Sequence, residues 1–159
     1  MRDALLQYLK KNKIDYKEHK HDAVFTVEQS KSNPDVQKIS GLRTKSLFLK
    51  DESNNFYLIT LPAEKRLDIK NLKSELNLKE LFFASPEELK SELNVSPGSV
   101  SMFGIINSSK TELILDESIF SAEIVCFHPN INTSTLELNK KNIENFFNSL
   151  KYKKKIIKL

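Results

Sequence analysis

Hydrophobic and polar positions follow helical spacing in several stretches of this chain. Residues 3–11 place Leu5, Leu6 and Leu9 on one face with charged residues opposite, which is the pattern of an amphipathic helix. Residues that commonly cap helices mark the start of four further helices. The caps are Thr26, Asp68, Ser85 and Asn139, and the predicted helices cover residues 27–31, 69–76, 86–93 and 140–150.

Other stretches show the two-residue alternation or the short apolar runs of strands. Residues 46–49 and 56–62 flank a polar turn at 51–55, and this arrangement predicts a hairpin. Because strands are joined by both turns and helices, we expect an α+β fold with a mixed, largely antiparallel sheet packed with helices. Further strands are predicted over residues 14–19, 23–26, 81–84 (as a buried strand), 112–116, 123–127 and 133–138.

Composition narrows the class of protein. The 159 residues are 39% hydrophobic and 29% charged, which fits one globular domain. No apolar run is long enough to cross a bilayer, and the amphipathic N-terminus does not read as a secretory signal. The single cysteine, Cys126, cannot form an internal disulfide. We therefore expect a single domain over residues 1–150, located in the cytoplasm and without membrane contact.

The positive charge is concentrated at the C-terminal end. The chain has 25 basic and 21 acidic residues, and five of the basic ones fall in residues 151–159, so the remainder is close to neutral. Such a basic tail can attract a phosphate backbone. A solvated, partly frayed end is the more common structure for a run of this kind, and this is what we expect for residues 151–159.

A glycine-containing loop stands out as candidate chemistry. The chain has three glycines, and Gly98 and Gly104 both lie within residues 94–107. Glycine permits a positive φ angle and close approach of the backbone to a ligand, and Pro97 favours a turn before Gly98. Successive backbone N–H groups in such a turn can bind an anion. An ordinary turn between a helix and a strand explains the same pattern equally well.

Other polar residues give weaker signals. His19 and His21 have the spacing of a metal-binding pair, but the sequence offers no obvious further ligands, and we expect no metal or cofactor. Cys126 and His128 would share one face of a strand, so a nucleophilic dyad is conceivable. Lys45, close to the start of a predicted strand, is either a surface charge or a substrate contact. Residues 127–133 form a polar loop that either lines a pocket or makes an ordinary turn.

Four segments, taken together, carry a resemblance to a known family. They read LPAEKRLDIKNL, LFFASPEEL, VSPGSVSMFGIIN and FHPNINTST, in this order along the chain. The chain resembles the YbaK/prolyl-tRNA-synthetase-associated editing domain superfamily, and within it the free-standing alanyl-tRNA(Pro) deacylases. The resemblance implies a YbaK-like fold and a trans-editing esterase that clears mischarged tRNA without a metal or a covalent intermediate.

The resemblance also implies roles for individual residues. The family's lysine falls on Lys45, and its glycine loop falls on residues 98–102. Two positions depart from the family pattern, because Met102 replaces the usual proline and Ser46 replaces a common asparagine. The candidate catalytic residues are Lys45, Gly98, Ser99, Val100 and Ser101, and the candidate substrate or acceptor-end contacts are Ser46, Met102, Phe103, Gly104, His128, Asn132, Thr133 and Thr26.

The expected partner is mischarged tRNA(Pro). Prolyl-tRNA synthetase and an elongation factor are candidate protein partners, and we expect the chain to act as a monomer. Two alternatives remain open at this point. The enzyme would act on a cysteinyl or seryl ester of tRNA(Pro), or the chain would be a non-catalytic module that binds tRNA or a synthetase, given the departures at Ser46 and Met102.

Overall fold

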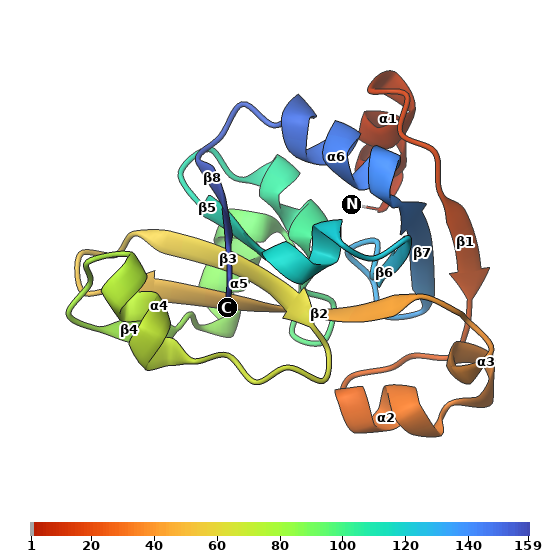
Figure 1. Ribbon diagram of the computed structural model, residues 1–159, viewed down its shortest axis with the longest axis horizontal. Helices are drawn as coiled ribbons and strands as arrows, with labels where there is room; N and C mark the ends of the chain where they lie inside the picture. The colour runs from red at the N-terminus through yellow and green to blue at the C-terminus, as the bar shows by residue number, and fades with distance from the viewer. Residues whose placement is uncertain (1) are drawn as a thin grey trace.

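The computed structural model describes residues 2–159, which form eight strands and their covering helices (Figure 1). The strand order is β1-β7-β6-β2-β3-β5-β8, and β4 pairs with β2 beside this path. The strands are β1 (Lys17–Lys20), β2 (Leu42–Asp51), β3 (Phe56–Pro62), β4 (Leu81–Phe83), β5 (Glu112–Asp116), β6 (Ile124–Phe127), β7 (Ser134–Asn139) and β8 (Lys154–Ile157).

The sheet is mixed. The pairs β1/β7, β6/β7, β2/β3 and β2/β4 are antiparallel. The pairs β2/β6, β3/β5 and β5/β8 are parallel. The expected α+β class with a mixed, largely antiparallel sheet is therefore confirmed. The helices are α1 (Arg2–Lys11), α2 (Val27–Ser32), α3 (Pro34–Gln37), α4 (Ile69–Glu75), α5 (Pro86–Leu93) and α6 (Lys140–Ser149), with 3₁₀ helices η1 (Met102–Asn107) and η2 (Glu117–Phe120).

The caps found in the sequence explain where these helices begin. The Thr26 side chain accepts a hydrogen bond from the backbone N–H of Gln29, which starts α2. Ser85 and Glu88 form a reciprocal capping box at α5, which satisfies two backbone donors at once. The side chains of Asp68 and Asn139 accept hydrogen bonds from the backbone N–H groups of Asn71 and Asn142, and so cap α4 and α6. All four predicted caps are confirmed.

Most of the buried side chains form one large cluster on one side of the sheet. It takes in α1, α5, η1 and α6, and Figure 1 shows α1 and α6 lying side by side. Phe103 of η1 lies in edge-to-face contact with Phe127 and Phe146, at centroid distances of 5.5 and 5.0 Å. A smaller cluster on the other side includes Leu72 of α4 and Ile59 of β3. The residues around the glycine loop are thus tied to the main core.

Several local expectations differ from the structure. Residues 23–26 lead into α2 without forming a strand, and β2 begins at Leu42, so Lys45 lies inside the strand. Strand β4 is an edge strand whose Phe82 and Phe83 are 50% and 63% exposed, so the prediction of a buried strand there is wrong. Its only strand partner among residues 2–159 is β2, so its other edge has no strand beside it.

The basic C-terminal segment also differs from the frayed end that we expected. Residues 154–157 form β8, which pairs in parallel with β5. Asp116 is fully buried, and it accepts hydrogen bonds from the backbone N–H of Leu159 at 2.8 Å and from Lys65 at 3.3 Å. Lys154 Nζ donates to the carbonyl oxygens of Phe147 and Leu150, at 2.6 and 2.8 Å. These contacts fix the segment because each buried polar group finds a partner.

Over residues 2–159, none of the helices combines the length and the apolar character that crossing a membrane requires.

Candidate active site

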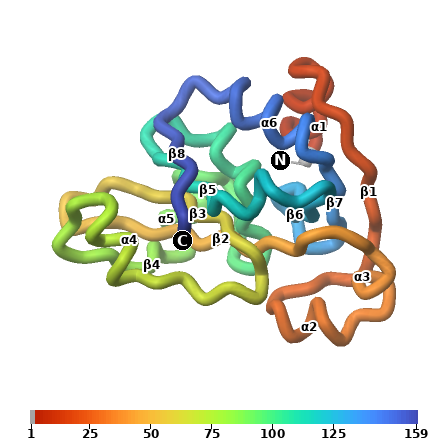
Figure 2. The backbone as a smooth tube through the Cα atoms, in the orientation of Figure 1, coloured from red at the N-terminus to blue at the C-terminus, as the bar shows by residue number. Residues whose placement is uncertain are grey.

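A cavity of about 230 Å³ lies where α2 and α3 meet the first half of β2. Figure 2 shows these two helices together at one corner of the molecule, beside the start of β2. Ala63, Glu64 and Thr135 line part of the walls, and four further chain segments, far apart in sequence, supply the rest. They are residues 24–39, residues 43–46 of β2, the loop around Gly98 and Val100, and residues 126–128 at the end of β6.

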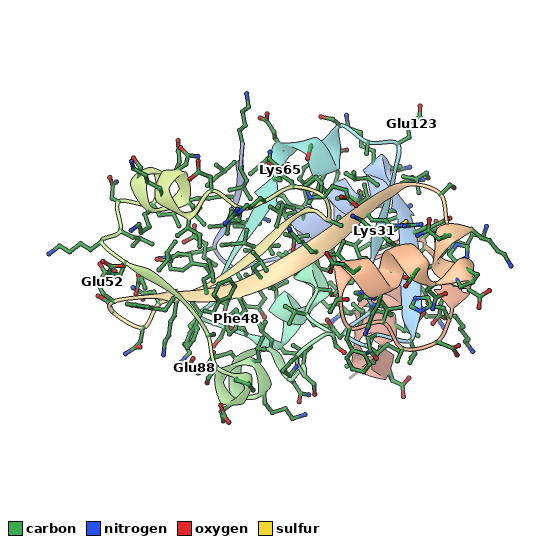
Figure 3. All side chains as sticks on the ribbon, turned by 90° about the horizontal axis from the view of Figure 1, so that it is seen from below. Lys31, Phe48, Glu52, Lys65, Glu88 and Glu123 are labelled. Atoms are coloured by element: carbon green, nitrogen blue, oxygen red, sulfur yellow. The ribbon has the colours of Figure 1, made fainter. Side chains whose placement is uncertain are left out.

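Lys45 is a half-buried cation on the wall of this cavity. Strand β2 holds its backbone opposite Leu61 of β3. Within residues 2–159, no carboxylate forms an ion pair with Lys45. By contrast, Lys31 of α2, which lines the same cavity, lies 3.1 Å from Glu64. Figure 3 shows Lys31 between α2 and the long strands. The amine of Lys45 is therefore available to an anionic ligand, whereas the guanidinium of Arg43, on the same wall, donates to the carbonyl of Val36.

Gly98 forms another part of the wall and has the backbone geometry that the sequence predicted. Its φ angle is +86°, a region that side chains with a Cβ rarely adopt. A Cβ at this position would lie 3.1 Å from the ring of Phe25, which is itself 60% exposed and lines the cavity. Gly104 has no such geometry, so the glycine requirement holds for one of the two loop glycines.

The loop around Gly98 carries free backbone donors. The amide of Ser99 donates to the carbonyl of Ser96 at 3.0 Å, which closes the turn. In the part of the chain that the structure describes, the amides of Gly98 and Val100 donate to no other group. Both residues line the cavity. The loop therefore offers two unused N–H groups in the neighbourhood of Lys45.

His128 stands on another wall of the cavity in its neutral form. Its Nδ1 lies 3.1 Å from the carbonyl oxygen of Ser134, and because a carbonyl only accepts, Nδ1 carries the proton. Burial lowers the pKa of His128, and nearby His21 lowers it further, while the bond to Ser134 opposes both effects. The neutral ring presents Nε2 as a hydrogen-bond acceptor.

Cys126 does not behave as a nucleophile. Its thiol donates to the carbonyl oxygen of Ser40 at 3.3 Å. Burial and the charge of Glu137 raise the pKa of Cys126 to about 11, against a smaller opposing effect of Arg43. A thiol with this pKa stays protonated near neutral pH, so the geometry does not support a dyad with His128.

The histidines at positions 19 and 21 are held by separate partners. His19 Nε2 lies 3.0 Å from Glu137, and His21 Nε2 lies 2.9 Å from the hydroxyl of Thr135. No cluster of three or more His, Cys, Asp or Glu side chains that could hold a metal occurs within residues 2–159.

The structure brings some of the candidate residues together at the cavity. Thr26, Lys45, Ser46, Gly98, Val100 and His128 all line it. Thr26 also caps α2, and Ser46 shares a 2.6 Å hydrogen bond with Thr60 of β3. These six residues come from four separate segments. The elements predicted from the sequence did not by themselves show that these segments meet.

The other candidate residues lie outside the lining. Met102, Phe103 and Gly104 belong to η1 and are buried in the core. Ser99 and Ser101 are also buried, and Ser101 caps η1 by accepting from the N–H of Phe103. Asn132 and Thr133 act through their carbonyl oxygens, which accept from the N–H groups of Val24 and His21, both at 3.0 Å.

Sequence reasoning missed the apolar wall of the cavity. Val24, Val36 and Ile39 are buried and line it from the segment around α2 and α3. Arg43 fixes this segment, because its guanidinium donates to the carbonyl of Val36 at 2.7 Å. The available signal was the pair of short helix starts at Thr26 and at Asn33–Pro34, which indicated a compact helical segment rather than a strand.

Comparison with known proteins identifies the family. Residues 21–146 match the aminoacyl-tRNA editing domain. The chain belongs to this family. The matched region contains every segment that lines the cavity and leaves out α1, β1, the end of α6 and β8.

Named relatives in the family share most of their length with this chain. The prolyl-tRNA editing protein ProX of Acetoanaerobium sticklandii is 30% identical over 146 residues, which cover 90% of this chain and 88% of the relative. Prolyl-tRNA synthetase associated domain-containing protein 1 of Xenopus laevis is 29% identical, covering 92% and 89%. A crystal structure provisionally described as a trans-editing enzyme for prolyl tRNA synthetase has the same fold, with a TM-score of 0.76, 18% identity, and coverage of 99% and 96%.

Proposed function

We propose that this editing-domain protein is a trans-editing deacylase that hydrolyses the ester of mischarged tRNA(Pro), with alanyl-tRNA(Pro) as its preferred substrate. One observation carries the proposal: Lys45 has no ion-pair partner among residues 2–159 and shares a cavity with the unused amides of Gly98 and Val100. The name of the ProX relative supports the choice of prolyl-tRNA as the nucleic acid.

The two amides fit the chemistry of ester hydrolysis. An aminoacyl ester is already activated, so the reaction needs a placed water molecule and stabilisation of the oxygen that becomes negatively charged. Backbone N–H groups directed at that oxygen contribute on the order of 3 kcal/mol each. We assign this role to Gly98 and Val100, while Ser99 and Ser101 shape the loop that presents them. The ribose hydroxyl of the tRNA itself is a candidate to assist the water.

Lys45 fits a positioning role at the acceptor end. A lysine without a carboxylate partner is available to a phosphate oxygen of the terminal nucleotide. Binding the phosphate in this way would hold the ester close to the loop in a fixed orientation. Proximity and orientation account for a large part of many enzymatic rate enhancements. His128, Ser46 and Thr26 surround the same space and would contact the aminoacyl group or the ribose.

The cavity walls favour a small aminoacyl group. Val24, Val36 and Ile39 give one wall an apolar character, and a pocket of fixed size rejects larger side chains sterically. An apolar pocket discriminates poorly against a group that only adds a hydroxyl. Seryl- and cysteinyl-tRNA(Pro) are therefore the second candidate substrates.

The two departures from the family pattern bear on the non-catalytic alternative. Met102 is fully buried, so it anchors the loop through the core in place of a proline. The hydroxyl of Ser46 is bonded to Thr60 and stays at the cavity wall. Both arrangements support a rigid site, and for this reason we favour an enzyme over a binding module. We further propose that it acts in the cytoplasm as a monomer, on tRNA released by prolyl-tRNA synthetase or carried by an elongation factor.

The experiment is deacylation of tRNA(Pro) charged separately with alanine, serine, cysteine and proline. We expect fast loss of the alanyl ester, survival of the prolyl ester, and loss of activity in Lys45→Ala. A preference for serine or cysteine would keep the mechanism and change the substrate. Rates equal to spontaneous hydrolysis for every ester, with tRNA still bound, would establish the binding module instead.

A further inference from the structure

Two loops that each form part of the cavity wall meet at one buried hydrogen bond. Ser101 Oγ donates to Asn130 Oδ1 at 3.1 Å, and both residues are 2% exposed. Val100 precedes Ser101, and His128 lies two residues before Asn130. Val100 and His128 both line the cavity, whereas neither Ser101 nor Asn130 does. The hydrogen bond therefore lies behind the wall and ties its two parts together.

Asn130 has two features that folding alone does not require. Its φ angle is +61°, the left-handed region that asparagine tolerates better than most residues with a Cβ. Its Nδ2 group is buried without a hydrogen-bond partner. A buried donor without a partner lowers stability, and such departures concentrate at functional sites. The protein thus keeps Asn130 at a cost to its own stability.

The partner of Asn130 is anchored to the core. Ser101 Oγ accepts from the N–H of Phe103 at 3.1 Å, so its own proton is free for Asn130. Phe103 is fully buried and packs against Phe127 and Phe146. Through this chain of contacts, Asn130 is connected to the buried aromatic side chains of the main core.

The loop of Asn130 also holds a third part of the wall. The carbonyl oxygens of Asn132 and Thr133 accept from the N–H groups of Val24 and His21, both at 3.0 Å. Val24 and the adjacent Phe25 line the cavity. One short loop, residues 128–133, therefore carries His128 and contacts the walls formed by residues 24–25 and 98–100.

We propose that Asn130 is a positioning residue that fixes the separation of Val100 from His128 and so sets the size of the aminoacyl group that the cavity accepts. The proposal rests on the deacylase function proposed above. Exclusion of a larger side chain requires walls that do not yield. Loosening the Ser101–Asn130 bond lets the cavity widen, so the prolyl ester gains access while alanyl hydrolysis persists.

The test compares kcat/KM for alanyl- and prolyl-tRNA(Pro) in three single variants and one double variant. Asn130→Gly keeps the left-handed backbone and removes the side chain, and Ser101→Ala removes the donor. We expect the alanyl-to-prolyl ratio to fall by about tenfold in each, and the double variant to fall no further because both changes break the same bond. Asn130→Asp keeps the acceptor oxygen, and its ratio should stay within about threefold of wild type.

A matched control separates positioning from a loss of stability. Ser108 is buried and donates to Thr111 at 2.8 Å, outside the cavity lining. Ser108→Ala should lower the thermal midpoint and leave the ratio unchanged. An unchanged ratio in folded Ser101→Ala and Asn130→Gly, with an active wild type, would overturn the positioning role. If Asn130→Gly does not fold, Ser101→Ala alone decides. A wild type that hydrolyses no ester would instead refute the deacylase function itself.

Discussion

Two of the charged residues of strand β2, Lys45 and Asp51, lie six positions apart and have opposite surroundings. Asp51, at the hairpin end, is 3% exposed and accepts hydrogen bonds from the N–H groups of Ser53 and Asn55 and from the hydroxyl of Tyr57. Lys45, at the cavity end, has no ion-pair partner among the residues described. Even spacing places both on the same face of the strand. A charge whose partners all lie within the fold stabilises that fold, and a charge left without one is available to a ligand.

The hairpin end shows how a buried charge is tolerated. Burial alone would raise the pKa of Asp51, but the hydrogen bonds from Asn55, Tyr57 and Ser53 outweigh burial and lower it. Burial raises the pKa of the Tyr57 phenol, and the hydrogen bond to Asp51 raises it further. Each group is therefore held in one protonation state near neutral pH, with no chemistry to perform.

The largest effect on stability is expected at this hairpin end. Asp51→Ala removes the acceptor of several hydrogen bonds, and we expect a loss of about 3 kcal/mol in the free energy of unfolding. Urea denaturation measures the change. Deacylation per folded molecule should remain within a few-fold of wild type. A stable Asp51→Ala protein with impaired deacylation would reverse the roles that we assign to the two ends of β2.

The next largest effect is expected at Gly98, in the cavity wall. Alanine at a φ of +86° is strained, and its Cβ would press on Phe25. We expect Gly98→Ala to lose about 1–2 kcal/mol of stability and about tenfold in deacylation rate. Gly104→Ala is the matched control. A Cβ at this position would lie 3.4 Å from the nearest atom of Leu93, and the φ angle of Gly104 is not positive. Equal losses in both variants would argue against a special role for Gly98.

A smaller effect is expected from the titration of His128. Its pKa in the folded protein lies below the ordinary value of 6.5, so the unfolded chain binds more protons as the pH falls through that value. Stability should therefore be complete above pH 6.5 and decrease below it, by at most about 1.4 kcal/mol per pH unit. Thermal unfolding between pH 7.5 and 5.5 measures this slope. In His128→Gln, stability should depend less steeply on pH. An unchanged pH dependence would show that groups other than His128 take up the protons.

The smallest effect is expected at Lys31, the cavity lysine that has a partner. The side chains of Lys31 and Glu64 are 52% and 73% exposed, and exposed ion pairs contribute little. We expect Lys31→Met to change stability by less than about 0.5 kcal/mol. Chemical denaturation of Lys31→Met beside Glu64→Gln measures it. A loss above 1 kcal/mol would show that the pair holds α2 against the turn that follows β3.

The sequence predicted well the features that depend on nearby residues. The caps at Thr26, Asp68, Ser85 and Asn139 act through residues three positions away, so local patterns were sufficient. Strand β8 was missed because its lysine-rich sequence resembles a solvated tail. Its order comes from β5 and Asp116, about forty residues earlier in the chain.

The same distinction applies to the candidate site. Lys45, Gly98 and His128 were named from family motifs and do share the cavity. Phe103 and Gly104 stand in the same motif and lie in the core, because one segment supplies both the wall and the anchor behind it. The apolar wall around Val36 was not predicted, since no motif marks it and only the packing of α2 and α3 against β2 creates it.

The most direct test of the central claim is the rate of alanyl-tRNA(Pro) deacylation by Lys45→Ala, measured beside thermal unfolding of the same preparation. Lys110→Ala is the control, since Lys110 is an exposed lysine that pairs with Glu92 at 3.0 Å. We predict a loss of about 100-fold for Lys45→Ala, with a thermal midpoint within about 2 °C of wild type, and near wild-type activity for Lys110→Ala. A folded Lys45→Ala protein that deacylates as fast as wild type would contradict the account.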